Sequence, residues 1–221
     1  MKIAHPAFSG TLPISDKAPT SLIIENPPLL LKLLSELTEQ AEGGQGGFIL
    51  SEGNKELNIS KMAMLITDYV RASANTKTIL SKITASIEAR ALSPEYWEES
   101  QRLLSSAREL VDSLSSDLPC SLEYEKLYIQ SIVRALGIRI ADDAASCEER
   151  LLDLMDIARD LLGTRVFILV HFFSFFTPEV AEAFASSALA HGHRLLFIDA
   201  HQHQRLQGEH RLLIDSDLCE I

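Results

Sequence analysis

Residues 165–199 contain two short apolar runs separated by a helical stretch, and this segment limits the possible folds more than any other part of the sequence. The runs cover 166–170 and 195–198, and each has the length and the large or β-branched residues of a strand buried on both faces. Between them, Thr177-Pro178-Glu179 predicts a helix start and Gly192 predicts its end. A strand, a helix and a strand within about 34 residues have the size of a βαβ crossover, so the two strands should be parallel neighbours.

The N-terminal part of the chain also alternates between strand and helix patterns. Residues 2–8 and 21–25 are predicted to be strands, joined by a turn-rich connection. A helix should begin after Asn26 and continue to Glu42, because prolines open it and leucines recur at helical spacing. Another strand is expected at 48–50. Both ends of the chain are therefore predicted to belong to one α/β domain.

The middle of the chain has a different pattern, with amphipathic helices and almost no strand signal from about Ser60 to Leu162. One helix is predicted after Ser93-Pro94, and two more are predicted to end at Gly137 and Gly163. The expected organisation is an α/β domain with an α-helical domain inserted into it. The predicted boundaries are 1–60 and 148–221 for the α/β domain and 61–147 for the helical domain.

The helix predicted after Ser93-Pro94 has a wide apolar side. Its members are Leu103, Leu104, Ala107, Leu110, Val111 and Leu114. Helices with such sides usually pack against partner helices, and a small helical projection has few ways to cover them all by itself. The pattern therefore predicts self-association.

Charge and composition exclude several classes of protein. The net charge of -11 argues against a surface covered all over by nucleic acid, although it allows a local basic groove. No apolar run reaches the roughly 18 residues that cross a bilayer, and the N-terminus has no signal-peptide core, so we expect a cytoplasmic protein. The three cysteines are widely spaced and form neither a disulfide framework nor a zinc-finger pattern.

Residues 43–47, Gly-Gly-Gln-Gly-Gly, are glycine-rich but do not have the context of a phosphate-binding loop. They follow a predicted helix and precede a predicted strand, and no Gly-Lys-Ser or Gly-Lys-Thr follows them. We interpret them as a helix stop and a turn. The sequence also lacks a Gly-x-Ser-x-Gly elbow and a His-Glu-x-x-His motif, so it does not indicate an enzyme.

Five histidines lie close together in the C-terminal part, at His191, His193, His201, His203 and His210. Alternating imidazoles on a strand face the same side and could share a zinc ion, with Asp199 or Glu209 as an added carboxylate. The alternative is that they are surface residues around a strand end. The phenylalanines at 172, 173, 175 and 176 are predicted to be core beneath the crossover helix, although the carboxyl end of a central strand is also where α/β folds bind ligands.

Several longer segments carry a specific family resemblance. They are LEYEKLYIQSIVRALGIRI (122–140), ERLLDLMDIARDLL, RVFILVHFFSFFTPEVAEAF and RLLFID. Together they closely resemble the ring-forming spacer-acquisition protein of type II-A CRISPR systems, the Csn-two family. The resemblance extends over nearly the whole chain, and its most specific parts are the 134–140 turn and the strand-Phe-Thr-Pro-helix stretch.

This resemblance implies a fold and a role. The fold is a P-loop-like α/β head without nucleotide-binding motifs, with an inserted helical leg. Members of the family form homotetrameric rings and bind the ends of linear double-stranded DNA in a positively charged channel. They carry structural calcium and act with two integrase subunits and an effector nuclease in spacer acquisition, an antiviral defence. The family implies no catalytic site.

Under this resemblance, we expect DNA to contact basic residues of the segment that runs from the head into the leg, where acids are sparse. The DNA-binding candidates are Lys55, Lys61, Arg71, Lys77 and Lys82. Such residues would contact phosphates, which gives strong salt dependence and little sequence preference. The alternative for each is a solvated surface position.

The family's calcium ligands correspond here to Glu123 and Glu125. The site looks depleted, because the next residue is Lys126 and Ser131 stands about where the family tends to have an acid. Asp142, Asp143 or a neighbouring subunit could complete it. Two other functions stay open: a nucleotide-dependent enzyme with a degenerate phosphate loop, and a metal hydrolase that uses the histidines.

Overall fold

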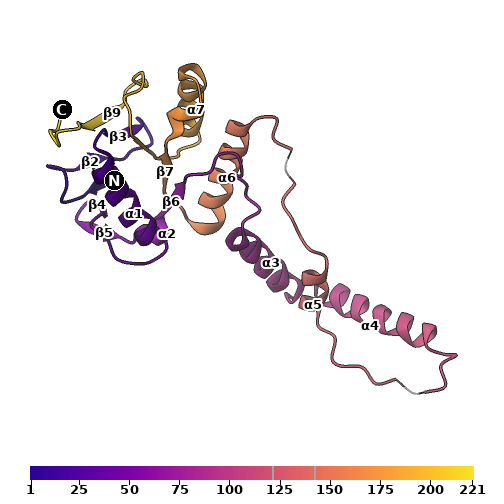
Figure 1. The fold of residues 1–221 in the computed structure, drawn as a ribbon. Helices are drawn as coiled ribbons and strands as arrows, with labels where there is room; N and C mark the ends of the chain where they lie inside the picture. The colour runs from indigo at the N-terminus through magenta and orange to yellow at the C-terminus, as the bar shows by residue number, and fades with distance from the viewer. Residues whose placement is uncertain (121, 142) are drawn as a thin grey trace. The chain divides into compact units, whose positions relative to one another are not determined.

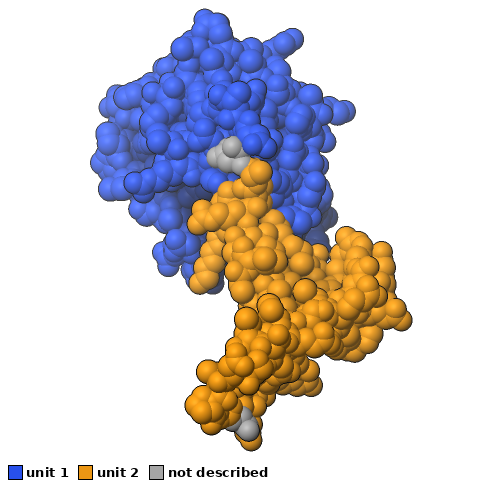
Figure 2. Space-filling model, turned by 90° about the vertical axis from the view of Figure 1, so that its right-hand side faces the viewer, with its two compact units in different colours: residues 1–74, 143–221 blue, residues 75–142 orange. Residues whose placement is uncertain are grey.

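The computed structural model describes residues 1–120, 122–141 and 143–221, which divide into two compact units. The first, which we call the head unit, comprises residues 1–74 and 143–221, and the second, the inserted unit, comprises residues 75–142 (Figure 2). The fold is mixed α/β. No helix among the described residues is long and apolar enough to cross a membrane.

A five-stranded parallel sheet forms the centre of the head unit. Its order is β6-β7-β8-β3-β9, with β3 at Thr20–Ile24, β6 at Ala63–Ile66, β7 at Val166–Val170, β8 at Leu195–Asp199 and β9 at His210–Ile214. Strands β7 and β8 pair in parallel, with Ile168 opposite Leu196, and α7 (Pro178–Ala190) connects them. The predicted βαβ crossover is therefore confirmed.

Two layers cover the faces of this sheet (Figure 1). On one face, helix α1 (Pro27–Ala41) and a small antiparallel sheet pack against alternate residues of β3, β7 and β8 in one apolar core. The small sheet has the order β2-β1-β4-β5, with β1 at Lys2–Ala4, β2 at Leu12–Pro13, β4 at Ile49–Glu52 and β5 at Lys55–Leu57. On the other face lie α6 (Cys147–Leu162) and α7 (Figure 1).

The predicted starts and ends of several helices are confirmed. The Asn26 side chain accepts a hydrogen bond from the Leu29 N–H at 3.0 Å, which caps α1 ahead of its two prolines. The Thr177 hydroxyl caps α7 in the same way. Gly163 ends α6 with φ of +75°, a conformation that glycine adopts without strain.

Strand β6 lies in a stretch for which the sequence predicted helices. Residues 63–66 follow the single-turn helix α2 (Ile59–Met62) and pair with β7, with Leu65 opposite Ile168. Alanine, methionine and leucine favour helices, but pairing along the edge of β7 overrides this local preference. The expectation that almost no strand occurs between Ser60 and Leu162 was wrong at this point.

The inserted unit is helical. It contains α3 (Lys77–Ala91), α4 (Trp97–Leu114) and α5 (Ile129–Ala135). Its two ends are joined by Asn75, whose side chain donates to the Ile140 carbonyl at 3.0 Å and accepts from the Ile140 N–H at 2.9 Å. The predicted helix after Ser93-Pro94 is present, but it begins at Trp97.

Candidate DNA-binding and metal-binding sites

The five DNA-binding candidates are exposed and divided between the two units. Lys55 on β5, Lys61 on α2 and Arg71 belong to the head unit, whereas Lys77 and Lys82 lie on α3 of the inserted unit. The structure therefore brings only Lys77 and Lys82 together on one element. Arg71 lies 3.9 Å from Asp68, so part of its charge is compensated locally.

Helix α3 is the most basic helix among the described residues. It carries Lys77, Lys82 and Arg90 against one acid, Glu88. The Arg134 guanidinium of α5 donates to both Glu88 carboxylate oxygens, at 2.7 and 3.3 Å, and this pairing raises the pKa of Arg134. Because Glu88 is neutralised in this way, the cations of α3 are not balanced by an acid of their own helix.

A hollow of about 590 Å³ lies within the inserted unit next to these charges. Lys77, Glu88 and Arg134 line it together with Asn75, Leu80, Ser81, Thr84 and Ala85. Two cations and one acid give it a positive balance. Arg134 was not among the predicted DNA-binding residues, although it begins the 134–140 turn that carries the family resemblance.

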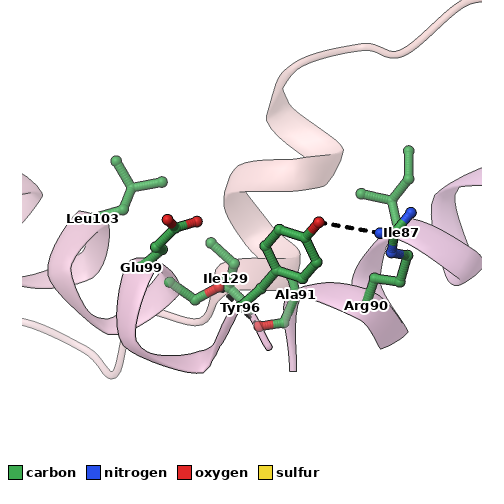
Figure 3. Close-up of a pocket in the computed structure, with 8 residues that line it drawn as sticks. Ile87, Arg90, Ala91, Tyr96, Glu99, Leu103 and Ile129 are labelled. Carbon is green, nitrogen blue, oxygen red and sulfur yellow. Dashed lines mark hydrogen bonds between the residues drawn. The ribbon is translucent and has the colours of Figure 1, made fainter. Parts of the chain in front are cut away.

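A second hollow in the inserted unit, of about 370 Å³, is mainly apolar (Figure 3). Ile87 and Ala91 of α3, Leu103 of α4 and Ile129 of α5 form much of its lining. At its rim the Arg90 guanidinium donates to the Tyr96 hydroxyl at 3.1 Å. This hollow offers packing surface rather than groups for catalysis.

The apolar side of α4 is largely uncovered in the single chain. Of its predicted members Leu104 is buried, whereas Leu103, Leu110 and Leu114 are 49%, 60% and 75% exposed. Apolar side chains exposed together along one helix mark a surface that packs against another protein surface. The sequence-based prediction of uncovered apolar stripes is confirmed for this helix.

Glu123 and Glu125, the predicted calcium ligands, are exposed residues between α4 and α5. Among the described residues, neither belongs to a group of three or more potential metal ligands whose donor atoms lie close together. Lys126 places its ammonium 5.4 Å from the centre of the Tyr128 ring. Asp142, which could complete the site, lies outside the described residues, so the calcium site stays a prediction.

The glycine-rich segment 43–47 ends α1 and leads to β4, as predicted. Gly43 has φ of +94°. The N–H of Gly47 donates to the Glu36 carboxylate at 2.9 Å. The Gln40 side chain donates a hydrogen bond to the Phe48 carbonyl and accepts one from the Phe48 N–H. The Glu36 carboxylate thus already accepts from the Gly47 N–H, a backbone donor that a bound phosphate would need, so this segment is a structural turn.

The start of α1 directly follows β3 and is a second possible phosphate site. Pro27 and Pro28 occupy its first positions and have no backbone N–H, and the Asn26 side chain already accepts from Leu29. The donors through which a helix N-terminus binds phosphate are thus removed or used.

The carboxyl ends of β7 and β8 border a hollow of about 310 Å³. Its wall includes Asp199 and His203, and the His203 ring stacks on Phe173 with centres 3.4 Å apart. Burial raises the pKa of Asp199, and His171, whose Nδ1 lies 3.5 Å from Asp199 Oδ1, opposes this shift. Burial lowers the pKa of His203.

The phenylalanine cluster divides between core and pocket. Phe172 is fully buried against Phe184 of α7 and Phe197 of β8, with ring centres 4.9 and 5.3 Å apart, which confirms the core interpretation for it. Phe173 lines the hollow, and Phe175 is 59% exposed.

The five histidines do not form one site, because the two His-x-His pairs lie at opposite ends of β8. His203 lies near Glu209, but that carboxylate is 2.8 Å from the Arg211 guanidinium and is committed to an ion pair. His191 and His193 precede β8 and approach Asp156 of α6. The surface interpretation is wrong for His193, which is 2% exposed, and the sequence had not indicated Asp156.

A family model connects this architecture to known proteins. Residues 40–218 match the model of the family described as CRISPR-associated protein (Cas_Csn2). The chain belongs to this family. The match confirms the resemblance found in the sequence and supports a CRISPR-associated role.

The match to the Cas_Csn2 family covers both units. It includes the inserted unit and the head elements from the end of α1 to β9. All five basic candidates, both calcium candidates and the Asp156–His191–His193 group lie within it.

Proposed function

We propose that this Cas_Csn2 family member binds the ends of linear double-stranded DNA as a homotetrameric ring, without catalysis, in type II-A CRISPR spacer acquisition. Family membership carries the CRISPR-associated part of this proposal. The uncovered apolar side of α4 is the structural observation that supports assembly, because these leucines need a partner surface.

Helix α3 is the element that best supports contact with DNA. Its exposed Lys77 and Lys82 are not ion-paired to any residue in the described ranges, and Arg134 neutralises the acid of the same helix. Lysines at such positions attract phosphates without reading bases, which suits binding to ends of any sequence. Local cations of this kind are compatible with the net charge of -11 when the acids lie on other surfaces.

The remaining parts of the proposal follow the family's role. The ring acts in the cytoplasm as a scaffold or adaptor for the two integrase subunits and the effector nuclease. Calcium stabilises it structurally through Glu123 and Glu125, completed by further oxygen ligands, because calcium takes six to eight.

A nucleotide-dependent enzyme is the alternative function, and the hollow beside Asp199 is the feature in its favour, since parallel sheets bind ligands at this edge. The prolines that open α1 count against phosphate binding, and so does the carboxylate at the hollow. A nucleotide bound only by the native state must raise the melting temperature, so an unchanged melting temperature with ATP would remove this alternative.

The deciding experiment compares linear and covalently closed circular duplexes of one sequence, with calcium and then with a chelator, over a salt series. A ring threaded over an end binds only the linear form, and its affinity falls as salt rises. Loss of binding with the chelator would support the calcium site. Equal binding to both forms would overturn the ring, and binding to neither would overturn the role in DNA binding.

A further inference from the structure

Asp156, His191 and His193 bring three potential metal ligands together on the head unit. Asp156 lies on α6, His191 ends α7, and His193 precedes β8, separated from it by Arg194. Among the described residues, this is the group of histidine, cysteine and acidic side chains whose donor atoms all lie within 4.8 Å of one another. We propose that these three residues bind a divalent transition-metal ion, for which zinc is the reference ion.

The distances between the donor atoms suit one ion. The Nδ1 atom of His191 lies 2.9 Å from Asp156 Oδ2, and the Nε2 atom of His193 lies 3.1 Å from Asp156 Oδ1. Zinc binds nitrogen and oxygen at about 2.0–2.2 Å in tetrahedral geometry, which places neighbouring donor atoms about 3.3–3.6 Å apart. Only small movements of these side chains would admit the ion.

His193 is the observation that points to a ligand. Its side chain is 0% exposed, and within the described part of the chain neither ring nitrogen makes a hydrogen bond: Nε2 only approaches Asp156 Oδ1, at 3.1 Å, outside hydrogen-bond geometry. Buried polar atoms are normally hydrogen-bonded, so these two ring nitrogens leave a bonding capacity that a metal ion between His193 and Asp156 would use. The His193 ring packs edge-on against Phe167, with centres 5.1 Å apart, which fixes its orientation.

The nearby Arg159 does not exclude a cation from this position. Its guanidinium lies 3.0 Å from Asp156 Oδ1 and 2.8 Å from Asp160 Oδ1, so two carboxylates share one positive charge. Arg159 also donates to the His191 carbonyl at 2.8 Å. It therefore orients both the carboxylate and the histidine-bearing turn, as residues around metal ligands commonly do.

The donor set selects the class of ion. Two imidazoles and one carboxylate suit zinc and related transition metals, whereas calcium prefers oxygen ligands alone. Asp156 is partly exposed and His191 is exposed, so water can supply the fourth ligand. Such an ion would tie α6 to the turn between α7 and β8, and it is independent of the proposed calcium at Glu123 and Glu125.

The test uses the full chain, stripped of metal and dialysed against micromolar zinc with calcium and magnesium in excess. We expect one equivalent of zinc per chain by elemental analysis, a raised melting temperature, and the visible bands of tetrahedral cobalt when Co²⁺ replaces zinc. His191→Gln should weaken zinc binding at least about 100-fold and abolish the stabilisation, since even residues behind the ligands contribute 10- to 100-fold.

His201→Gln is the matched control, because it removes an exposed histidine from the other His-x-His pair. It should bind zinc as the wild type does. His191 is exposed, so its variant should fold, and its melting temperature without zinc verifies this. Absence of zinc from the wild type, unchanged binding by His191→Gln, or equal loss in His201→Gln would each overturn the proposal.

Discussion

The Tyr69 hydroxyl donates a hydrogen bond to the carbonyl oxygen of Val170, 2.8 Å away, although 101 residues separate the two in sequence. Tyr69 follows β6 and Val170 ends β7, so the whole inserted unit lies between them along the chain. Tyr69 is 2% exposed, and its ring contacts those of Phe172 and Phe176 edge-on. This bond thus connects the two parts of the head unit that precede and follow the inserted unit.

Tyr69→Phe should therefore destabilise the head unit while preserving the ring packing. Loss of the hydroxyl leaves a buried carbonyl without its donor, which costs about 1–3 kcal/mol in the free energy of unfolding. Urea denaturation measures this change. Tyr128→Phe, at an exposed tyrosine, should change it by less than about 0.5 kcal/mol, and equal effects of the two substitutions would contradict the prediction.

Charge reversal on α3 tests the DNA-binding surface. Lys77→Glu with Lys82→Glu should weaken binding to linear duplex strongly and reduce the slope of log affinity against log salt by about 2 per chain, because two phosphate contacts are lost. Fluorescence anisotropy over a salt series provides both values. Lys2→Glu with Lys17→Glu changes the net charge equally at exposed head positions, and if it weakened binding as much, the effect would be general rather than local.

Charges on the apolar side of α4 test the assembly. Leu110→Glu with Leu114→Glu should convert the oligomer to monomer without lowering the monomer's melting temperature, since both leucines are exposed in the single chain. Light scattering at micromolar protein reports the mass. Ser105→Glu with Ser113→Glu places the same charges on exposed positions of α4 outside its apolar side and should leave the oligomer intact. A monomeric wild type would refute the prediction outright.

Glu36 predicts a pH dependence of stability. The His5 side chain and the Gly47 N–H, each 2.9 Å from Glu36 Oε2, lower the pKa of this carboxyl below its ordinary value of 4.5. Stability from the ionised form is therefore complete above the ordinary pKa and is lost as the pH falls through the lowered one. Glu36→Gln should have a lower free energy of unfolding than the wild type near neutral pH, and this difference between the two proteins should become smaller in acid.

Urea unfolding of the wild type and Glu36→Gln at several pH values checks this trend. Glu39→Gln removes an exposed carboxylate from the same helix and should show no such trend. A gap that stayed constant or widened in acid would show that Glu36 does not act through its charge.

The parts of the fold that the sequence predicted are those with local signals. The runs at 166–170 and 195–198 are long and apolar enough to identify central strands, and the short crossover helix between them implies that they are parallel. The start of α1 carries its own cap and prolines. Each of these features depends on residues close together in sequence.

The features that the sequence did not predict depend on distant partners. Ala63–Ile66 becomes a strand because β7, a hundred or so residues later, offers an edge. Asp156 meets His191 across 35 residues, and Arg134 meets Glu88 across 46. No spacing rule connects such pairs, since the fold rather than the local pattern determines which side chains face one another.

The paired hydrogen bonds between Asn75 and Ile140 fasten the two ends of the inserted unit to each other. The central sheet therefore requires only that the chain leave and return at neighbouring points. The entropic cost of closing a loop grows slowly with its length, so residues can be added or removed between Asn75 and Ile140 with little effect on the stability of the sheet. The insertion can accordingly change its length and its binding surface over evolutionary time while the α/β domain keeps its register.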